Sequence, residues 1–320
     1  MLKKGISGST LKIIAVIAMI MDHTAWFIFD PLLRRSGVST SGFYAPLSQL
    51  SLSPVLCVLS PLFHTVGRIT FPIMLFALSE GVKYSKNKVK YIRNMAIFAL
   101  LSEIPFNLAN TKNVFCPARQ LTFLEGQNVF ITLTLSLIAL LLVQKLMNTE
   151  KLHRAVKLLN YFCPIIFYFC ASWYFVKRVL ASFGYKVVYP IVIFFAAVSL
   201  IAYAIFTRKT DNEKRVKINI SLLIITVAAL ISYVFESDYR FMGVVAAAII
   251  YALRENKVKA YGMGCLYLTC HTYAEAGAFL GLPLIKLYNG KRGLRLKYLF
   301  YIVYPAHLLI LYGIRLMINV

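Results

Sequence analysis

Residues 10–29 read TLKIIAVIAMIMDHTAWFIF, a run that is long and apolar enough to cross a bilayer. A transmembrane helix needs about 20 mostly apolar residues to cross a hydrocarbon layer of ~30 Å. The run nevertheless carries Lys12 near its start and Asp22 and His23 deep inside it. Because a charged group inside hydrocarbon costs several kcal/mol, these ionisable residues are candidates for function.

The rest of the chain continues this apolar character. Of its 320 residues, 59% are hydrophobic, against roughly 45–50% for an ordinary soluble domain. Its mean hydropathy is +0.71. Further apolar windows predict helices at 61–82, 91–109, 128–147, 158–176, 185–206, 218–235, 241–253, 260–285 and 297–318. We therefore expect an all-α, polytopic integral membrane bundle of about nine to eleven transmembrane helices, ten being favoured, in a single domain spanning 1–320.

Two segments do not fit a regular span. The window at 241–253 has only thirteen residues, so it predicts a tilted short span, a re-entrant half helix or part of a longer helix. The segment 30–60 contains Pro31, Pro46 and Pro54 among Ser and Leu. It is too broken for a span and too apolar for a free loop, and we expect it to pack against the bundle or lie at the interface.

The charge balance is strongly basic, with 35 Lys and Arg against 12 Asp and Glu and a net charge of +23. In a soluble chain this balance would indicate a nucleic-acid partner. Here the basic residues lie mostly in the short links between apolar windows, where they indicate topology and contact anionic lipid headgroups. We expect the lipid bilayer, and no nucleic acid, as a partner.

The positions of these basic residues predict orientation. Basic clusters at 83–93, 145–157, 208–217 and 254–259 share one side if the spans alternate. Lys and Arg are in excess in short cytoplasmic loops, so the N-terminus is expected in the cytoplasm and the protein in the cell (plasma or inner) membrane, as a multi-pass protein. The basic loop at 286–297 contradicts strict alternation of ten spans. Either it is an exception or 241–253 does not span.

The N-terminus and the cysteines give little further indication of function. Lys3 and Lys4 precede the first apolar run as in a signal peptide, but the run shows no small-residue cleavage site, and we expect it to remain as the first helix. The six cysteines form no C-x-x-C pair and are interpreted as small packing residues. No metal cofactor is expected.

The first run has a polar face. Lys12 and His23 are eleven residues apart, about three helical turns, so they share a face at about 16 Å. That spacing predicts a groove with a histidine base inside it. Adjacent residues point about 100° apart, so Asp22 is not placed to bond His23 and needs a partner from another helix. The alternative is a core histidine satisfied by a neighbouring hydroxyl.

The second polar constellation is GRITFPIMLFALSEG at 67–81. Arg68 and Glu80 bracket a helix that contains Pro72, and a proline inside a helix frees a backbone carbonyl. Arg68 offers five donors suited to a thioester carbonyl, a phosphate or a carboxylate. An Arg–Glu ion pair or a lipid-headgroup anchor remains the structural alternative.

Other polar residues are weaker candidates. In LLSEIPFNLAN, Glu103 and Asn107 lie four apart on one face, and Glu103 is a candidate second acid or counter-charge for Arg68. His271 and Glu275 have i, i+4 spacing suited to a metal, but a third ligand is missing. Asn128, Asp238 and His307 complete the candidates, and Asn128 begins a helix, where Asn is commonly a cap.

Seven stretches together resemble the TraX family, membrane proteins of conjugative transfer and pilin N-acetylation. In order along the chain they are LKIIAVIAMIMDH, GRITFPIMLFALSEG, YIRNMAIFALLSEIPFNLA, QNVFITLTLSL, SDYRFMGVV, LYNGKRG and KYLFYIVYPAHLLIL. That family is related to the type-3 membrane acyltransferases, which have an arginine, ten residues and a histidine in their first helix. Lys12, ten residues and His23 are similar in spacing, with lysine replacing arginine.

The resemblance implies transfer of acetyl from cytoplasmic acetyl-CoA to an amine or hydroxyl of a pilin-like peptide, a glycan or a lipid. His23 would then be the general base, assisted by Asp22 or Glu103. Arg68 would polarise the thioester carbonyl or hold the CoA phosphates. Lys12 and the basic loop from Lys83 to Arg93 would form the entrance for acyl-CoA.

A non-catalytic protein is the alternative. In a transporter, Asp22, His23, Arg68 and Glu103 would form a proton or substrate relay, whereas an assembly factor of a surface apparatus would need no such relay. Transporters often carry a two-fold internal repeat with paired broken helices, and the sequence shows none.

Overall fold

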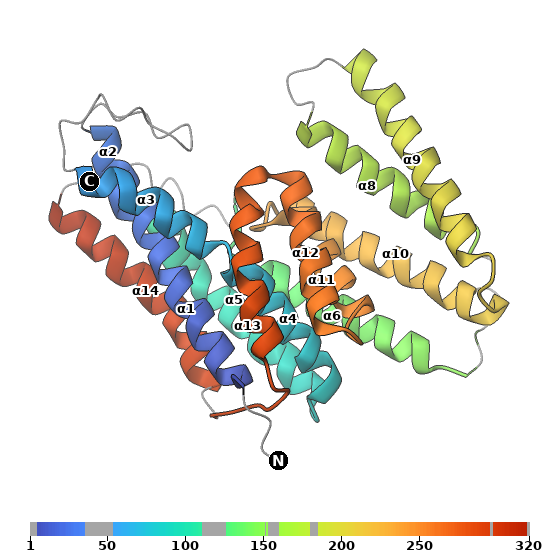
Figure 1. Cartoon of the computed structure of the whole chain (residues 1–320), viewed down its shortest axis with the longest axis horizontal. Helices are drawn as coiled ribbons and strands as arrows, with labels where there is room; N and C mark the ends of the chain where they lie inside the picture. The colour runs from blue at the N-terminus through green and yellow to red at the C-terminus, as the bar shows by residue number, and fades with distance from the viewer. Residues whose placement is uncertain are drawn as a thin grey trace.

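The computed structural model describes residues 5–35, 54–110, 126–150, 152, 160–179, 185–294 and 297–318, and regular structure in these ranges is helical (Figure 1). The helices are α1 (Gly8–Thr24), the π-helix η1 (Ala25–Phe29), α2 (Asp30–Arg35), α3 (Pro54–Gly67), α4 (Thr70–Tyr84), α5 (Lys88–Asn110), α6 (Val129–Asn148), α8 (Cys163–Val179), α9 (Tyr185–Thr207), α10 (Asn212–Val234), α11 (Arg240–Ala252), α12 (Lys257–His271), the 3₁₀ helix η4 (Tyr273–Gly281), α13 (Leu282–Leu287) and α14 (Lys297–Ile318). The predicted all-α class is confirmed.

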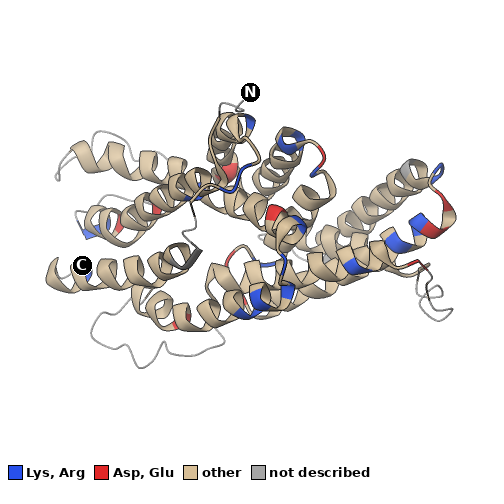
Figure 2. Ribbon diagram, turned by 90° about the horizontal axis from the view of Figure 1, so that it is seen from below, with Lys and Arg blue, Asp and Glu red and all other residues tan. Residues whose placement is uncertain are grey.

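The helices have the lengths and composition of a polytopic membrane protein. In the described ranges, six stretches are long and apolar enough to span: Gly8–Arg35, Pro54–Tyr84, Val129–Met147, Val188–Ile205, Asn212–Val234 and Leu299–Ile318. Long stretches of helix carry no charged side chain (Figure 2). Helices α8 and α11 are apolar but shorter, so this criterion gives fewer spans than the ten expected.

The side chains that begin several helices are short and polar. Ser7 accepts a hydrogen bond from the amide of Thr10 at 3.3 Å, and Asn256 accepts one from the amide of Lys259 at 3.1 Å. Asp211 accepts from the amides of Glu213 and Lys214 at the start of α10. Such caps satisfy amides that have no partner within the helix, which fixes where each helix begins.

The helix predicted at 61–82 is interrupted. Helix α3 begins earlier, at Pro54, and ends at Gly67; α4 begins at Thr70. Pro72 therefore lies in the first turn of α4, where a missing amide costs no helical bond, and the expected free carbonyl inside a helix is not formed. Arg68 lies at the break between α3 and α4.

Two predicted segments lie partly outside the described residues. Residues 36–53 of the segment 30–60 are outside them. So are residues 153–159, which include the end of the basic cluster at 145–157 and the start of the helix predicted at 158–176.

The helix predicted at 260–285 is wrong, because the chain folds back on itself there. Helix α12 ends at His271, Thr272 is extended, and η4 and α13 return beside α12 (Figure 1). The Tyr261 hydroxyl donates to the carbonyl of Ala278 at 2.9 Å, which joins the two arms.

This fold-back explains the basic loop that conflicted with the predicted alternation. The amide of Asn289 donates to the carbonyl of Ile6 at 3.0 Å, and the Tyr288 hydroxyl donates to Glu80 at 3.1 Å. Residues 286–294 therefore lie at the same end of the bundle as residue 6 and the end of α4. Helix α11 runs between the two ends with most of its side chains buried by neighbouring helices.

Candidate functional site

A cavity of about 1720 Å³ follows one face of α1 and η1 from Gly8 to Phe27. Its wall also includes residues of α3, α4, α5, α6, α8, α11, α14 and η4, and of the segments at 126–127, 236–239 and 288–294. Lys12 lines the end near the N-terminus, and His23 lines the other end. The polar face that the sequence predicted on the first helix thus borders one continuous space.

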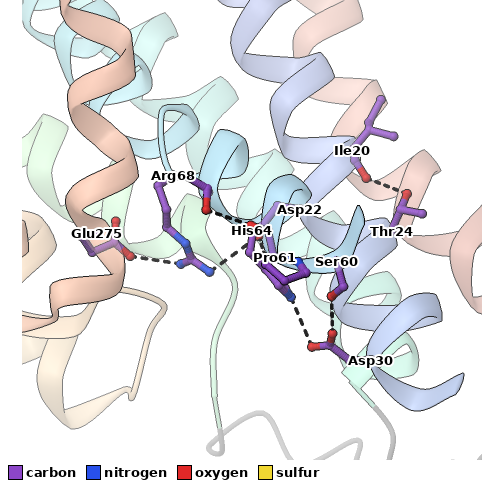
Figure 3. Close-up of polar contacts among 10 residues, drawn as sticks. Ile20, Asp22, Thr24, Asp30, Ser60, Pro61, His64, Arg68 and Glu275 are labelled. Carbon is purple, nitrogen blue, oxygen red and sulfur yellow. Dashed lines mark hydrogen bonds and ion pairs between the residues drawn. The ribbon is translucent and has the colours of Figure 1, made fainter. Parts of the chain in front are cut away.

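Arg68 and two carboxylates form the polar centre at the His23 end (Figure 3). Arg68 Nη1 lies 3.0 Å from Glu275 Oε1, and Arg68 Nη2 lies 3.6 Å from Asp22 Oδ1. All three residues line the cavity. The guanidinium is therefore held in one orientation by carboxylates from α1 and η4 while remaining accessible from the cavity.

Behind Asp22 lies a chain of hydrogen bonds that the sequence analysis missed. His64 Nδ1 lies 2.8 Å from Asp22 Oδ1, and His64 Nε2 lies 3.2 Å from Asp30 Oδ2. The Ser60 hydroxyl donates to Asp30 Oδ1 at 2.6 Å (Figure 3). Each nitrogen of His64 thus faces a carboxylate oxygen, and an imidazolium could donate to both aspartates at once.

Two local features of the chain bring these groups together. The π-helix at 25–29 changes the register of the first helix, after which Asp30 reaches His64. Gly67 allows α1 and α3 to approach closely, since a Cβ there would lie 2.3 Å from the Cβ of Asp22. A Cβ at Gly277 would likewise lie 2.3 Å from the carbonyl oxygen of Thr65, so η4 packs directly on α3.

His23 is paired with a histidine of the last helix. His23 Nδ1 lies 2.6 Å from His307 Nε2, and the two rings lie nearly coplanar and edge to edge, with an interplanar angle of 8° and centroids 4.9 Å apart. His307 Nδ1 lies 2.8 Å from the carbonyl of Val303. His307 is 5% exposed and is not among the cavity-lining residues. As expected, Asp22 takes its partner from another helix, and that partner is His64 of α3. His23 pairs with His307 of α14.

The loop at 236–240, within the sequence ESDYR, lines the same end of the cavity. Glu236, Tyr239 and Arg240 have positive φ angles of 50°, 60° and 41°, which are uncommon for residues with side chains. The ring of Tyr239 stacks on Phe71 with centroids 3.6 Å apart, and this contact holds the loop in place. Backbone conformations of this kind cluster at functional sites.

Asp238 belongs to this loop and lies outside the membrane-spanning helices. Its carboxylate is accessible from the cavity, yet removal from bulk water by the surrounding protein raises the pKa of Asp238 to about 6. Arg68 acts in the opposite direction and favours the ionised form. Asp238 is thus a carboxyl group that can exchange a proton near neutral pH at the cavity wall.

Comparison with known proteins agrees with this architecture. The family model described as TraX protein matches residues 7–176 and 171–315. The chain belongs to the TraX family. A probable fimbrial assembly protein FimC, serogroup H1, of Dichelobacter nodosus is 26% identical over 188 residues, which are 56% of this chain and 67% of that protein. No solved structure matches.

In this TraX-family chain, Glu103 does not pair with Arg68, contrary to one of the predicted roles. Glu103 is 2% exposed and accepts hydrogen bonds from the side chain and the amide of Asn128. Asn128 also caps α6 by accepting from the amide of Phe130 at 2.9 Å. Neither residue lines the cavity, whereas Asn107, one turn further along α5, does.

Part of the predicted basic entrance lines the cavity. Lys83 and Arg93 are exposed and do not line the cavity. Lys12 does line it, with its ammonium 5.7 Å from the centre of the Phe300 ring. Lys86 and Arg292 join Lys12 at this end of the cavity. Lys12 and Lys86 belong to the predicted entrance, and the fold-back at 272–287 adds Arg292 to it.

His271 and Glu275, four apart in the helix predicted at 260–285, lie in two separate helices. His271 ends α12 and lies among the rings of Tyr174, Phe175 and Tyr267. Glu275 lies in the first turn of η4 and points to Arg68 (Figure 3). Within the ranges that the structure describes, no cluster of three or more His, Cys, Asp or Glu is suited to a metal ion.

Proposed function

We propose that this TraX-family protein is a membrane acyltransferase that moves acetyl from acetyl-CoA to an amine or hydroxyl of a peptide, a glycan or a lipid. The observation that carries the proposal is that one cavity is lined by basic residues at one end and by an accessible histidine beside an oriented guanidinium at the other. Donor binding and proton abstraction would thus occur in one continuous space.

The basic end suits the donor. CoA carries several phosphate charges, and clustered cationic groups raise the local concentration of such a polyanion. Lys12, Lys86 and Arg292 supply those charges. From Lys12 to His23 the helix rises about 16 Å, a distance of the order of an extended pantetheine arm. With the N-terminus in the cytoplasm, as the loop charges predict, this end opens toward the cytoplasmic acetyl-CoA pool.

The other end suits the chemistry. Nε2 of His23 would accept the proton of the acceptor amine or hydroxyl as its nitrogen or oxygen bonds to the acetyl carbonyl carbon. Arg68 would stabilise the oxyanion that develops on the carbonyl oxygen. The carbon–sulfur bond then breaks, the thiolate of CoA takes the proton from His23, and the products are the acetylated acceptor and free CoA.

A pilin-like peptide is the acceptor that the comparison favours. The Dichelobacter nodosus relative is named as a probable fimbrial assembly protein, which suggests that the acceptor belongs to a surface fibre. An amine arrives largely as an ammonium ion, and the carboxylates of Asp22, Asp238 and Glu275 line the end of the cavity where it would be deprotonated. Glycan and lipid acceptors fit the same chemistry.

The test uses the full chain in nanodiscs with labelled acetyl-CoA. We expect the wild-type protein to bind acetyl-CoA and release CoA when an acceptor peptide is present, and His23→Gln to bind the donor but release CoA about 10²–10⁴-fold more slowly. Arg93→Ala is the matched control, because Arg93 is exposed and outside the cavity. A folded protein that neither binds nor cleaves acetyl-CoA would exclude the acyltransferase and favour a transporter or an assembly factor.

A further inference from the structure

The hydrogen bonds of His23 and His307 are sufficient to assign the protons on the two rings. A backbone carbonyl can only accept, so His307 Nδ1, at 2.8 Å from the carbonyl of Val303, carries a hydrogen. In a neutral His307 the other nitrogen, Nε2, then has a free lone pair. At 2.6 Å, only one of the two facing nitrogens can carry the shared hydrogen, so the donor is Nδ1 of His23.

The neutral form of His307 follows from its surroundings. An imidazolium would need a carboxylate, as His64 has in Asp22 and Asp30. The side chain of His307 is 5% exposed, and its hydrogen-bond partners among the described residues are His23 and the backbone carbonyls of Val303 and Tyr304, none of which is a carboxylate. Burying a cation in that position without a counter-charge is far less favourable than burying the neutral ring.

We propose that His307 is a positioning residue that fixes His23 in the Nδ1–H tautomer and so leaves Nε2 of His23 unprotonated for substrates in the cavity. His23 lines the cavity and His307 does not. The chain of hydrogen bonds therefore runs from the Val303 carbonyl through His307 to His23, and from His23 to a substrate in the cavity. The centroids of the Phe27 and Tyr304 rings lie 5.6 and 6.3 Å from that of His23, and these contacts hold the His23 ring in place.

The catalytic meaning of this inference rests on the proposed function, but the tautomer itself does not. When Nε2 of His23 takes a proton, the Nδ1–H bond to His307 strengthens, because a cationic donor binds a neutral acceptor more tightly than a neutral donor does. His307 would therefore both select the reactive nitrogen and stabilise the protonated intermediate. It would do so without touching the substrate.

The first test reads the protons directly. With ¹⁵N-labelled histidine in nanodiscs, and signals assigned by their loss in His23→Gln and His307→Gln, we expect Nδ1 of His23 to be protonated and Nε2 to be unprotonated at neutral pH. The His307 ring should show the same pattern. A wild-type spectrum with the hydrogen on Nε2 of His23, or with a cationic His307, would overturn the inference.

The second test compares His307→Gln with His307→Leu, which have similar volumes but differ in a hydrogen-bond acceptor. Diethyl pyrocarbonate attacks unprotonated imidazole nitrogens, and mass spectrometry gives the rate at each histidine. We expect the rate at His23 to fall about three- to tenfold in the leucine variant and to stay within about twofold of wild type in the glutamine variant. Equal rates in the two folded variants would refute the role of His307.

These readouts separate the two proposals. If the proton positions and the diethyl pyrocarbonate rates are as expected but acetyl-CoA is never cleaved, the tautomer stands and the acyltransferase fails. If acetyl transfer occurs while His23 carries its hydrogen on Nε2, the acyltransferase stands and the role of His307 fails. Where the leucine variant does not fold, the spectrum of the wild-type protein alone decides.

Discussion

Arg68 Nη1 lies 3.0 Å from Glu275 Oε1, which joins residues 207 positions apart in the chain. Arg68 lies at the break between α3 and α4, and Glu275 lies in the fold-back after α12. Glu275 is 3% exposed, so its charge is buried and needs this partner. Two interruptions of the predicted helices therefore create the ion pair that orients the guanidinium toward the cavity.

The first prediction concerns that guanidinium. Arg68→Ala should reduce acetyl transfer about 10²–10³-fold, because it removes a preorganised donor from the developing oxyanion. Arg68→Lys should recover only part of the loss, since an ammonium cannot bond both Asp22 and Glu275 in the same fork. The measurement is CoA release in nanodiscs, normalised to protein recovered from the membrane fraction. Unchanged turnover in a folded Arg68→Ala protein would remove Arg68 from the site.

The second prediction concerns His64, which bridges Asp22 and Asp30. His64→Ala should lower the free energy of unfolding by about 1–3 kcal/mol, because the carboxylates of Asp22 and Asp30 lose their hydrogen-bond partner. Thermal unfolding in detergent measures this loss. In an Asp22→Asn background the same substitution should cost less, since one of the charges that His64 neutralises is already absent. If the loss in free energy of unfolding in the double variant equals the sum of the two single losses, His64 and Asp22 do not interact.

The fold class and the polar face of the first helix were predictable from local sequence. Apolar windows located most helices, and the spacing of Lys12 and His23 placed both on one face. The partners of Arg68 were not predictable in the same way. Glu103 lies on the next helix in the sequence and was the nearer candidate, but the actual partner, Glu275, depends on a chain reversal at Thr272.

His64 was missed for a different reason. It lies within the helix predicted at 61–82, but its two partners, Asp22 of α1 and Asp30 of α2, come from a distant part of the chain. The available signal was that His64 lies one turn before Arg68 on the same helix face. Of the predicted basic entrance, Lys12 and Lys86 line the cavity, whereas Lys83 and Arg93 are exposed outside it.

The third prediction concerns close packing at Gly67. Gly67→Ala should destabilise the protein and disturb the site, because the new Cβ would overlap the side chain of Asp22. Gly313→Ala is the matched control: this glycine is also in a helix, and nothing lies within 4 Å of the added Cβ. There the substitution should be neutral, or stabilising by about 0.5–1 kcal/mol. Equal melting temperatures for the two variants would contradict the close approach of α1 and α3.

The fourth prediction concerns topology. In a background without the six native cysteines, Lys86→Cys and Lys291→Cys should be labelled by a membrane-impermeant thiol reagent from the same side, and Glu236→Cys from the opposite side. The reason is that η4 and α13 return beside α12, which places the loop at 288–294 next to the end of α4. All three positions are exposed, so labelling does not require unfolding. If 260–285 were one continuous span, Lys291→Cys would instead be labelled together with Glu236→Cys. Labelling of the Lys86 and Lys291 variants only in inverted vesicles would in addition place that end, and with it Lys12, on the cytoplasmic side.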